Sequence, residues 1–197
     1  MNTQLIFASA NRNKAAEIQS LLPQGYTVIT MKEAGWDAEI PEPYDTLAAN
    51  SRAKAQTIHA FTGKNVFAED TGLEVDTLNG APGVKSARYA GEPANDQKNI
   101  EKLLRALGHT TRRSARFRTV ITLIFEGTEY QFEGVCEGSI AHTPAGDAGF
   151  GYDPVFIPQG ANHTFAQMGL AEKNRYSHRK KALAAMLAFL KEKAGAH

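Results

Sequence analysis

The order of segments in this sequence predicts an α/β fold, with a mixed twisted sheet and flanking helices. Apolar runs typical of buried strands alternate with runs of helical spacing, which is the pattern of a sheet covered by helices. Two segments rich in Val, Ile, Thr and Phe, 116–125 and 129–137, are separated only by Glu126-Gly127-Thr128 and predict an antiparallel hairpin. With 197 residues, 42% of them hydrophobic, the chain suffices for one good core. We therefore predict one domain over residues 1–197.

The predicted elements start with a strand, a loop and a helix. A buried strand at Leu5–Ala8 leads through the polar loop Ser9–Asn13 into a helix over Lys14–Leu22. The later elements, in order, are a strand at Tyr26–Met31, a helix from about Thr46 to His59 capped by Asp45, a strand at Asn65–Glu69, a turn-rich stretch at 79–83, a helix over Asp96–Leu107 started by Asn95 or Asp96, the hairpin, and a helix from Ser177. The last helix carries an apolar stripe that predicts core or dimer packing, at Leu183, Met186, Leu187 and Leu190.

Composition excludes several classes of function. Lys and Arg number 22 against 21 Asp and Glu, and this net charge of +1 provides no field for non-specific nucleic-acid binding. The single cysteine, Cys136, excludes a disulfide framework and a cysteine-built zinc site, and its strand-like surroundings predict a small buried hydrophobe. No targeting segment or membrane-spanning stretch is evident, so we predict a soluble cytoplasmic protein without a nucleic-acid or membrane partner.

Two adjacent carboxylates, Glu69 and Asp70, follow the apolar run Val66-Phe67-Ala68 and precede Thr71-Gly72. A strand points successive side chains to opposite faces, so the two groups near a predicted strand end can serve different tasks. Carboxylate oxygens are ligands that Mg²⁺ accepts, usually one or two at a time, with substrate phosphates completing the shell. The alternative for an isolated pair is a charged strand end before a Gly turn.

Positive charge occurs where the helix dipole disfavours it. Lys14 is expected in the first turn of its helix, and Ser177-His178-Arg179-Lys180-Lys181 opens the last helix. An anion at either place would reverse the sign of the interaction, and a polar loop before a helix start can bind phosphate. Lys54 and Lys173 would add charge to such a site. The alternative at each place is a solvated surface lysine.

A glycine-dense loop, Gly146–Pro154, contains two aromatic side chains and two carboxylates. Glycine lets the backbone approach a flat ligand, and Phe150 can offer a stacking face. Asp153 or backbone groups can bind a base edge. The alternative is an ordinary turn with a buried aromatic anchor.

Six ordered blocks together resemble the Ham1-like inosine triphosphate pyrophosphatases, over about Phe7 to Leu183. These blocks are Ser9-Ala10-Asn11-Arg12-Asn13-Lys14, Glu69-Asp70-Thr71-Gly72-Leu73, Gly80-Ala81-Pro82-Gly83, Ser86-Ala87-Arg88-Tyr89, Gly149-Phe150-Gly151-Tyr152-Asp153-Pro154 and Ser177-His178-Arg179. The resemblance implies two lobes around a nucleotide-binding cleft, a homodimer, and Mg²⁺-dependent hydrolysis of ITP, dITP and XTP to the monophosphate and pyrophosphate, which cleanses the nucleotide pool.

The resemblance also implies the role of each site residue. Phosphate binding falls to the first loop and two lysines, namely Ser9, Ala10, Asn11, Arg12, Asn13, Lys14 and Lys54. Catalysis falls to Asp70, as general base or metal carboxylate, and to Lys14, with Glu42 and Glu69 assisting the metal. The remaining substrate-binding residues are Thr71, Phe150, Gly151, Tyr152, Asp153, Lys173, His178 and Arg179, with Phe150 stacking and His178-Arg179 at the purine edge.

This chain departs from the family pattern in three places. Ser9-Ala10-Asn11 stands where relatives often have Thr-Gly-Asn, and Glu69-Asp70 stands where they often have Asp-Asp. The segment Thr46–Ser51 lacks the two acidic residues of Thr-Phe-Glu-Glu-Asn-Ala, which leaves Glu42 as the nearest carboxylate.

The expected reaction is attack on the α-phosphorus by a water that Asp70 activates, with pyrophosphate leaving. Selectivity would come from the purine six-position, where inosine and xanthosine present a carbonyl and adenosine an amino group. The rival hypothesis is a nucleotide sensor, or a single-stranded RNA-binding module, that uses the same lysines and aromatics without catalysis.

Overall fold

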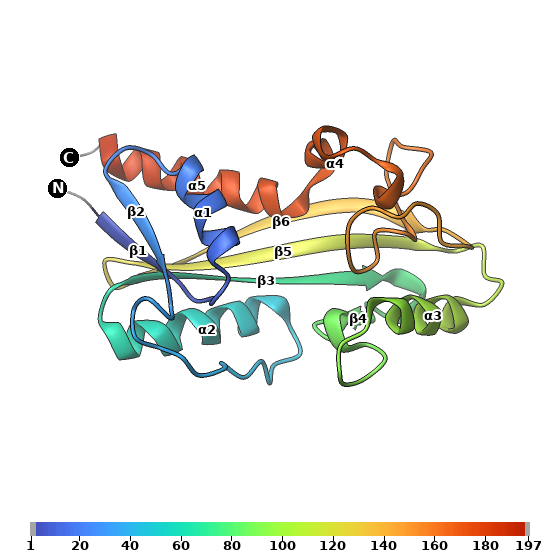
Figure 1. Cartoon of the computed structure of the whole chain (residues 1–197), viewed down its shortest axis with the longest axis horizontal. Coiled ribbons are helices and arrows are strands. Elements are labelled where there is room, and N and C mark those ends of the chain that lie inside the picture. The colour runs from blue at the N-terminus through green and yellow to red at the C-terminus, as the bar shows by residue number, and fades with distance from the viewer. Residues whose placement is uncertain (1–2, 196–197) are drawn as a thin grey trace. The chain divides into compact units, whose positions relative to one another are not determined.

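The computed structural model of the chain describes residues 3–195, apart from the side chains of Asn13 and Glu17. Its elements are β1 (Thr3–Phe7), α1 (Arg12–Leu21), β2 (Tyr26–Thr30), α2 (Leu47–Thr62), β3 (Asn65–Val75), β4 (Pro82–Gly83), α3 (Asp96–Leu107), β5 (Ser114–Phe125), β6 (Thr128–Ile140), β7 (Phe156–Pro158), α4 (Leu170–Tyr176) and α5 (His178–Gly195) (Figure 1). Three short 3₁₀ helices lie at Asp76–Leu78, Ser86–Arg88 and Phe165–Gln167.

The strands form a mixed sheet in the order β2-β1-β3-β5-β6-β7, with β4 paired to β3. β1 pairs in parallel with β2 and β3, whereas β3–β4 and β6–β7 are antiparallel. A two-residue turn joins β5 to β6, and positive φ angles at Glu126 (50°) and Gly127 (76°) suit a hairpin turn of this length. The predicted mixed α/β sheet with flanking helices is therefore confirmed.

Contacts divide the chain into two compact units. Unit 1 comprises residues up to Asp70, Val120–Glu133 and the chain from Ala182, and unit 2 comprises Thr71–Thr119 and Gly134–Lys181. β3, β5, β6 and α5 contribute residues to both units. The single domain over residues 1–197 and the cleft between two lobes stay predictions.

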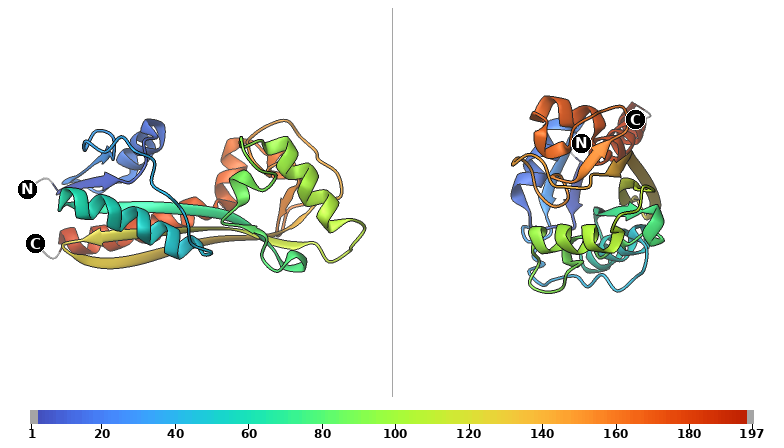
Figure 2. Two further views of the ribbon diagram at one scale, coloured as in Figure 1. Left: turned by 90° about the horizontal axis from the view of Figure 1, so that it is seen from below. Right: turned by 90° about the vertical axis from the view of Figure 1, so that its right-hand side faces the viewer.

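In unit 1, helices cover both faces of the sheet. Leu5, Phe7 and Phe67 pack in one buried cluster with residues of α1 and α5. Ile6 and Val66 pack in another cluster with residues of α2, because neighbouring strand residues point to opposite faces. Figure 1 shows α1 and α5 on one side of these strands and α2 on the other, and the left view of Figure 2 shows α2, in teal, lying over its face.

In unit 2, one core gathers residues of β3, α3, β5, β6 and the segment after β6. Leu73, Leu103 and Phe156, from three of these segments, are among its fully buried members. Cys136 of β6 belongs to the same core with 2% exposure, so the prediction of a small buried hydrophobe is confirmed. Burial raises the pKa of its thiol to about 11.

Most predicted elements are confirmed within a few residues. Two short strands were missed, β7 and β4, and β4 lies in the stretch 79–83 that was expected to form turns. Three further details differ. β3 does not end at a Gly turn after Asp70; it continues through Gly72 to Val75 and pairs with β4, so the turn begins only at Asp76. The cap of α2 is Thr46 rather than Asp45, because the Thr46 side chain accepts the Ala49 N–H at 3.1 Å. The segment before Ser177 was not predicted to be helical, although it forms α4.

The stripe on α5 packs in the core of unit 1. Leu183, Met186 and Leu190 are buried there, and Leu187 packs against them. Within residues 3–195, none of the helices combines the length and the apolar character that crossing a membrane would need.

Candidate active site

The first loop leads from the end of β1 into the capped start of α1. Asn11 is the N-cap, and its Oδ1 accepts the Lys14 N–H at 3.0 Å, while the Asn11 N–H donates to Ser9 Oγ at 3.2 Å. Lys14 therefore lies in the first helical turn, as predicted. Ala10 and Arg12 are exposed, and Arg12 Nε lies 3.9 Å from a Glu33 carboxylate. The Asn13 side chain lies outside the described part of the structure.

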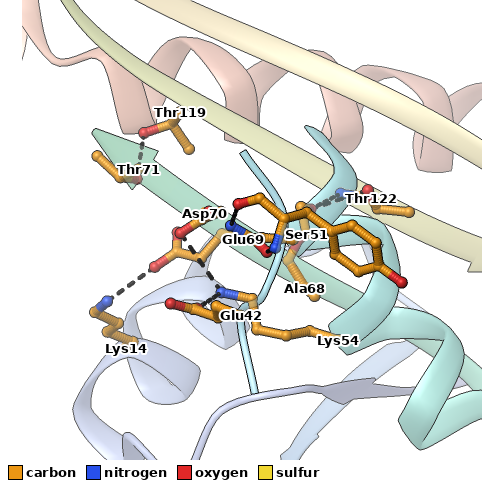
Figure 3. Close-up of polar contacts among 12 residues, drawn as sticks. Lys14, Glu42, Ser51, Lys54, Ala68, Glu69, Asp70, Thr71, Thr119 and Thr122 are labelled. Atoms are coloured by element: carbon orange, nitrogen blue, oxygen red, sulfur yellow. Dashed lines mark hydrogen bonds and ion pairs between the residues drawn. The ribbon is translucent and has the colours of Figure 1, made fainter. Parts of the chain in front are cut away.

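Lys14 pairs with Glu69 across the α1 face of the sheet. Its ammonium lies 2.9 Å from Glu69 Oε1, and the two side chains are 35% and 10% exposed (Figure 3). Glu69 follows Phe67 by two residues, so strand alternation turns it toward α1. The positive end of the helix dipole disfavours a lysine at this position, and the Glu69 carboxylate offsets that repulsion. Lys14 is therefore not a solvated surface lysine.

Lys54 lies between two carboxylates on the α2 face. Its ammonium is 2.5 Å from Glu42 Oε1 and 3.6 Å from Asp70 Oδ1 (Figure 3). The Lys54 and Asp70 side chains are only 12% and 11% exposed, so the interaction is weakly screened by water. Asp70 follows Ala68 by two residues and shares its face of β3. Successive carboxylates on β3 thus bind cations from different helices.

A metal ion would compete with these lysines for the carboxylates. Asp70 and Glu42 converge on one cationic group, and hard carboxylate oxygens of this kind suit Mg²⁺, which needs only one or two protein ligands when phosphates supply the rest. The residues present therefore fit the ion. Among the described residues, no three His, Cys, Asp or Glu side chains form a group that could hold a metal. A joint metal site of Glu42, Glu69 and Asp70 stays a prediction.

Buried polar residues that the sequence did not reveal hold this arrangement. Ser51 of α2 is fully buried, and its Oγ lies 3.1 Å from the Ala68 carbonyl oxygen and accepts the Thr122 N–H at 2.9 Å. Asn50 is also buried and bonds both the N–H and the carbonyl of Tyr44 at 3.0 Å, next to the Glu42 segment. Asn50 and Ser51 therefore fix the segment next to Glu42 and the β3 backbone before Glu69.

In unit 2, a buried hydroxyl fixes the predicted substrate residue Thr71. Thr71 Oγ1 lies 2.7 Å from Thr119 Oγ1 of β5, and Thr119 is fully buried (Figure 3). Thr119 was not singled out from the sequence because a Thr inside a strand gives no distinctive signal.

The glycine-rich loop presents an aromatic ring to solvent. Phe150 is 73% exposed, whereas Asp153 is 4% exposed and accepts the Phe150 N–H at 3.0 Å. Asp153 also binds the Lys173 ammonium, which lies 5.0 Å from the Phe150 ring centroid. The Phe150 ring, predicted as a stacking face, is thus accessible to a ligand. Asp153 itself holds the loop and Lys173, which is a different arrangement from a carboxylate directed at a base.

Tyr152 anchors the other side of this loop. Its ring is buried in the core of unit 2, and its hydroxyl donates to the Ser86 carbonyl at 2.8 Å. Burial raises the pKa of Tyr152, so the hydroxyl stays protonated as a donor. Gly151, between Tyr152 and Phe150, adopts a positive φ of 61°.

A series of rings links His178 with Lys173. The His178 imidazole stacks on Phe117, with ring centroids 5.0 Å apart and planes 13° apart. Phe117 in turn contacts Phe165, whose centroid lies 5.4 Å from the Lys173 ammonium. His178 and Arg179 are half-buried and open α5, as the sequence predicts. Unit 2 therefore gathers Phe150, Lys173 and His178 around one aromatic cluster.

A family model described as "Ham1 family" matches residues 5–189, which is nearly the whole chain. The chain belongs to the Ham1 family. A dITP/XTP pyrophosphatase of Flavobacterium johnsoniae is 48% identical over 187 residues, which cover 95% of this chain and 97% of that protein. A protein of the same name from Bacillus subtilis is 43% identical over 184 residues, 91% of this chain and 93% of its own.

Solved structures of Ham1 proteins have the same fold. The Ham1 protein of Staphylococcus aureus superposes with a TM-score of 0.93 at 38% identity, covering 97% of this chain and 100% of its own. A nucleoside-triphosphatase described as a dITP/XTP pyrophosphatase, from Mycobacterium abscessus, has a TM-score of 0.85 at 39% identity, covering 94% of this chain and 99% of its own.

Proposed function

We propose that this protein is a nucleoside triphosphate pyrophosphatase that hydrolyses non-standard purine nucleotides, ITP, dITP and XTP, to the monophosphate and pyrophosphate. The proposal is supported by membership of the Ham1 family and by relatives named dITP/XTP pyrophosphatase. The structural observation that carries it is the pair of successive carboxylates on β3, each bound to a lysine from a different helix. Such a set can exchange its internal ion pairs for a triphosphate and a divalent cation.

Lys14 and Lys54 would bind the phosphates, and Asp70 would accept the proton of the attacking water. Both ammonium groups are paired with carboxylates in this structure. A bound triphosphate would pair with the two lysines instead, which would leave the carboxylates able to bind a metal ion or a water molecule. Mg²⁺ held by Asp70, with Glu42 and Glu69 assisting, would neutralise charge on the phosphoryl oxygens. The two lysines would position the triphosphate and would also neutralise charge on the phosphoryl oxygens as the bond breaks.

The residues of unit 2 would select the base. The exposed Phe150 ring offers a stacking face, and Lys173, His178 and Arg179 can donate hydrogen bonds to a six-carbonyl. Adenine presents an amino donor there, so donors in the site would be left mispaired. The resemblance to the family also predicts a homodimer; this and the cytoplasmic location stay predictions.

A substrate panel tests this function. The purified protein is incubated with Mg²⁺ and, separately, ITP, dITP, XTP, ATP or GTP, and pyrophosphate and monophosphate are quantified. We expect equal amounts of both products, formed fastest from ITP, dITP and XTP. A nucleotide sensor would bind ITP, as measured by calorimetry, without releasing pyrophosphate. That result would reject the proposed enzyme activity in favour of the sensor hypothesis. If ATP were hydrolysed as fast as ITP, the proposed selectivity for the base would be wrong.

A further inference from the structure

The exposed ring of Phe150 has little apolar packing to fix its direction, and the ring contacts the Lys173 ammonium, 5.0 Å from its centroid. Phe150 is 73% exposed. The glycines on both sides have positive φ angles, 84° at Gly149 and 61° at Gly151, so the backbone there is intrinsically adaptable. Where apolar contact is small, the orientation of a side chain depends on how firmly its backbone is held.

Two carboxylates accept the successive backbone N–H groups of this segment. Asp153 Oδ2 accepts from Phe150 at 3.0 Å, and Asp96 Oδ2 accepts from Gly151 at 2.7 Å. Hydrogen bonds to ionised acceptors are shorter and stronger than those between neutral groups. Asp153 belongs to the same turn, whereas Asp96 is the first residue of α3 and lies 55 residues earlier in the chain. The bond from Asp96 therefore ties the turn to another element of unit 2.

Helix α3 is a firm support for that tie. Asn95 caps it, accepting the Lys98 N–H at 2.9 Å, and Ile100 and Leu103 anchor it in the core of unit 2. Buried Asn99 follows Asp96 by three residues; its amide accepts the Ala90 N–H at 2.7 Å and donates to the Ala87 carbonyl at 2.9 Å. A carboxylate in the first turn also complements the helix dipole. A group mounted on a helix holds its geometry better than one on a loop.

We propose that Asp96 is a positioning residue for the base-stacking ring of Phe150. This inference rests on the proposed function, in which Phe150 stacks on the purine. Asp96 acts through the Gly151 N–H: it fixes the backbone before the nucleotide binds, so less freedom is lost on binding. Without the carboxylate, the Gly151 N–H bonds to water and the ring samples other directions. Base binding then weakens, while the phosphates react at an unchanged set of groups.

Steady-state kinetics with ITP give the first test. In Asp96→Ala we expect KM to rise about three- to tenfold, the range for one lost hydrogen bond, with kcat nearly unchanged. Asp96→Asn keeps a carbonyl oxygen as acceptor, so its KM should lie between those of the wild type and the alanine variant. Glu101→Ala is the matched control, because Glu101 is exposed on the same helix and accepts a hydrogen bond from Gln97, one turn away.

An NMR measurement tests the tie itself, independently of activity. Phe150-Gly151 is the only Phe-Gly step in the sequence, so ¹³C-carbonyl phenylalanine with ¹⁵N-glycine yields a single correlated amide signal. We expect the Gly151 amide proton to move upfield in Asp96→Ala, to move less in Asp96→Asn, and to stay in place in Glu101→Ala. The asparagine variant, which has nearly the same shape as the wild type, carries the test if the alanine variant does not fold.

The results separate the two proposals. A Gly151 signal unchanged by both Asp96 substitutions overturns the positioning role, and so does a loss of kcat with an unchanged KM. If the wild-type protein releases no pyrophosphate from ITP, the proposed function fails, and the Gly151 signal still decides whether Asp96 holds the loop.

Discussion

At the scale of residues, both lysines expected to bind phosphate are held by carboxylates of the same chain. Lys54 is the more enclosed, with 12% of its side chain exposed and two carboxylates nearby, whereas Lys14 pairs with Glu69 and is 35% exposed. Removing one member of a poorly solvated ion pair leaves the other charge without its partner. Asp70 is therefore best replaced by asparagine, which keeps its shape.

Asp70→Asn tests the proposed general base. The fold should be kept, because Lys54 retains Glu42 at 2.5 Å. Turnover of ITP should fall by at least about a hundredfold, the usual scale for loss of a general base. Asp37→Asn is the control, because Asp37 also pairs with a lysine, Lys32 at 3.0 Å, but on an exposed loop. Near wild-type turnover in folded Asp70→Asn would remove Asp70 from the mechanism.

Arg179→Ala tests base selection at the start of α5. If Arg179 donates to a six-carbonyl, its loss should reduce kcat/KM for ITP more than for ATP, which lacks that acceptor. The quantity to measure is the ratio of the two kcat/KM values. Lys180→Ala, at the exposed neighbouring position, should leave the ratio unchanged. Lowered activity with an unchanged ratio in Arg179→Ala would reassign the residue to phosphate binding.

At the scale of elements, β3 shows where local sequence was misleading. The Thr71-Gly72 pair predicts a turn, yet the strand continues, because Leu73 and Val75 are fully buried and Leu73 pairs with Gly83 of β4. The alternation of Leu73, Glu74 and Val75 is itself a strand pattern, and it outweighs a single glycine once β4 supplies a partner. Glu69 and Asp70 consequently lie inside a strand that fixes their opposite directions.

The glycine loop gives a matched pair of variants. A Cβ at Gly149 would lie 2.0 Å from Asp153 Oδ2, whereas a Cβ at Gly151 would meet nothing within 4 Å, although both residues have positive φ. Both substitutions carry a backbone cost of about 1–2 kcal/mol. Only Gly149→Ala should also displace the carboxylate that holds Phe150 and Lys173. We expect a larger rise in KM for ITP in Gly149→Ala, and equal effects would contradict this role of Asp153.

Cys136 on β6 predicts a pH dependence of stability. Burial raises its pKa from 9.0 to about 11, so above pH 9 the unfolded chain loses a proton that the folded chain keeps. This contribution to stability is therefore full below pH 9 and declines as the pH rises toward 11. We expect the unfolding free energy of the wild type, minus that of Cys136→Ala, to decrease across this interval. A constant difference would show that the thiol titrates equally in both states.

At the scale of the whole molecule, the sequence predicted the α/β class and most elements, because periodicity and turn residues are local signals. Lys14 and Asp70 could be identified from the sequence, because their residue types and their positions within motifs are local features. The partners of these residues depend on pairings distant in sequence. Ser51 with Thr122, and Asp96 with Gly151, are 71 and 55 residues apart and carry no signature that a sequence pattern displays.

In the proposed reaction water attacks the α-phosphorus of the nucleotide, and hydrolysis of ITP in H₂¹⁸O shows whether it does. Mass spectrometry of both products shows where the oxygen enters. Attack at the α-phosphorus gives one ¹⁸O in the inosine monophosphate and none in the pyrophosphate. Label in the pyrophosphate, or release of inorganic phosphate with a nucleoside diphosphate, would contradict it.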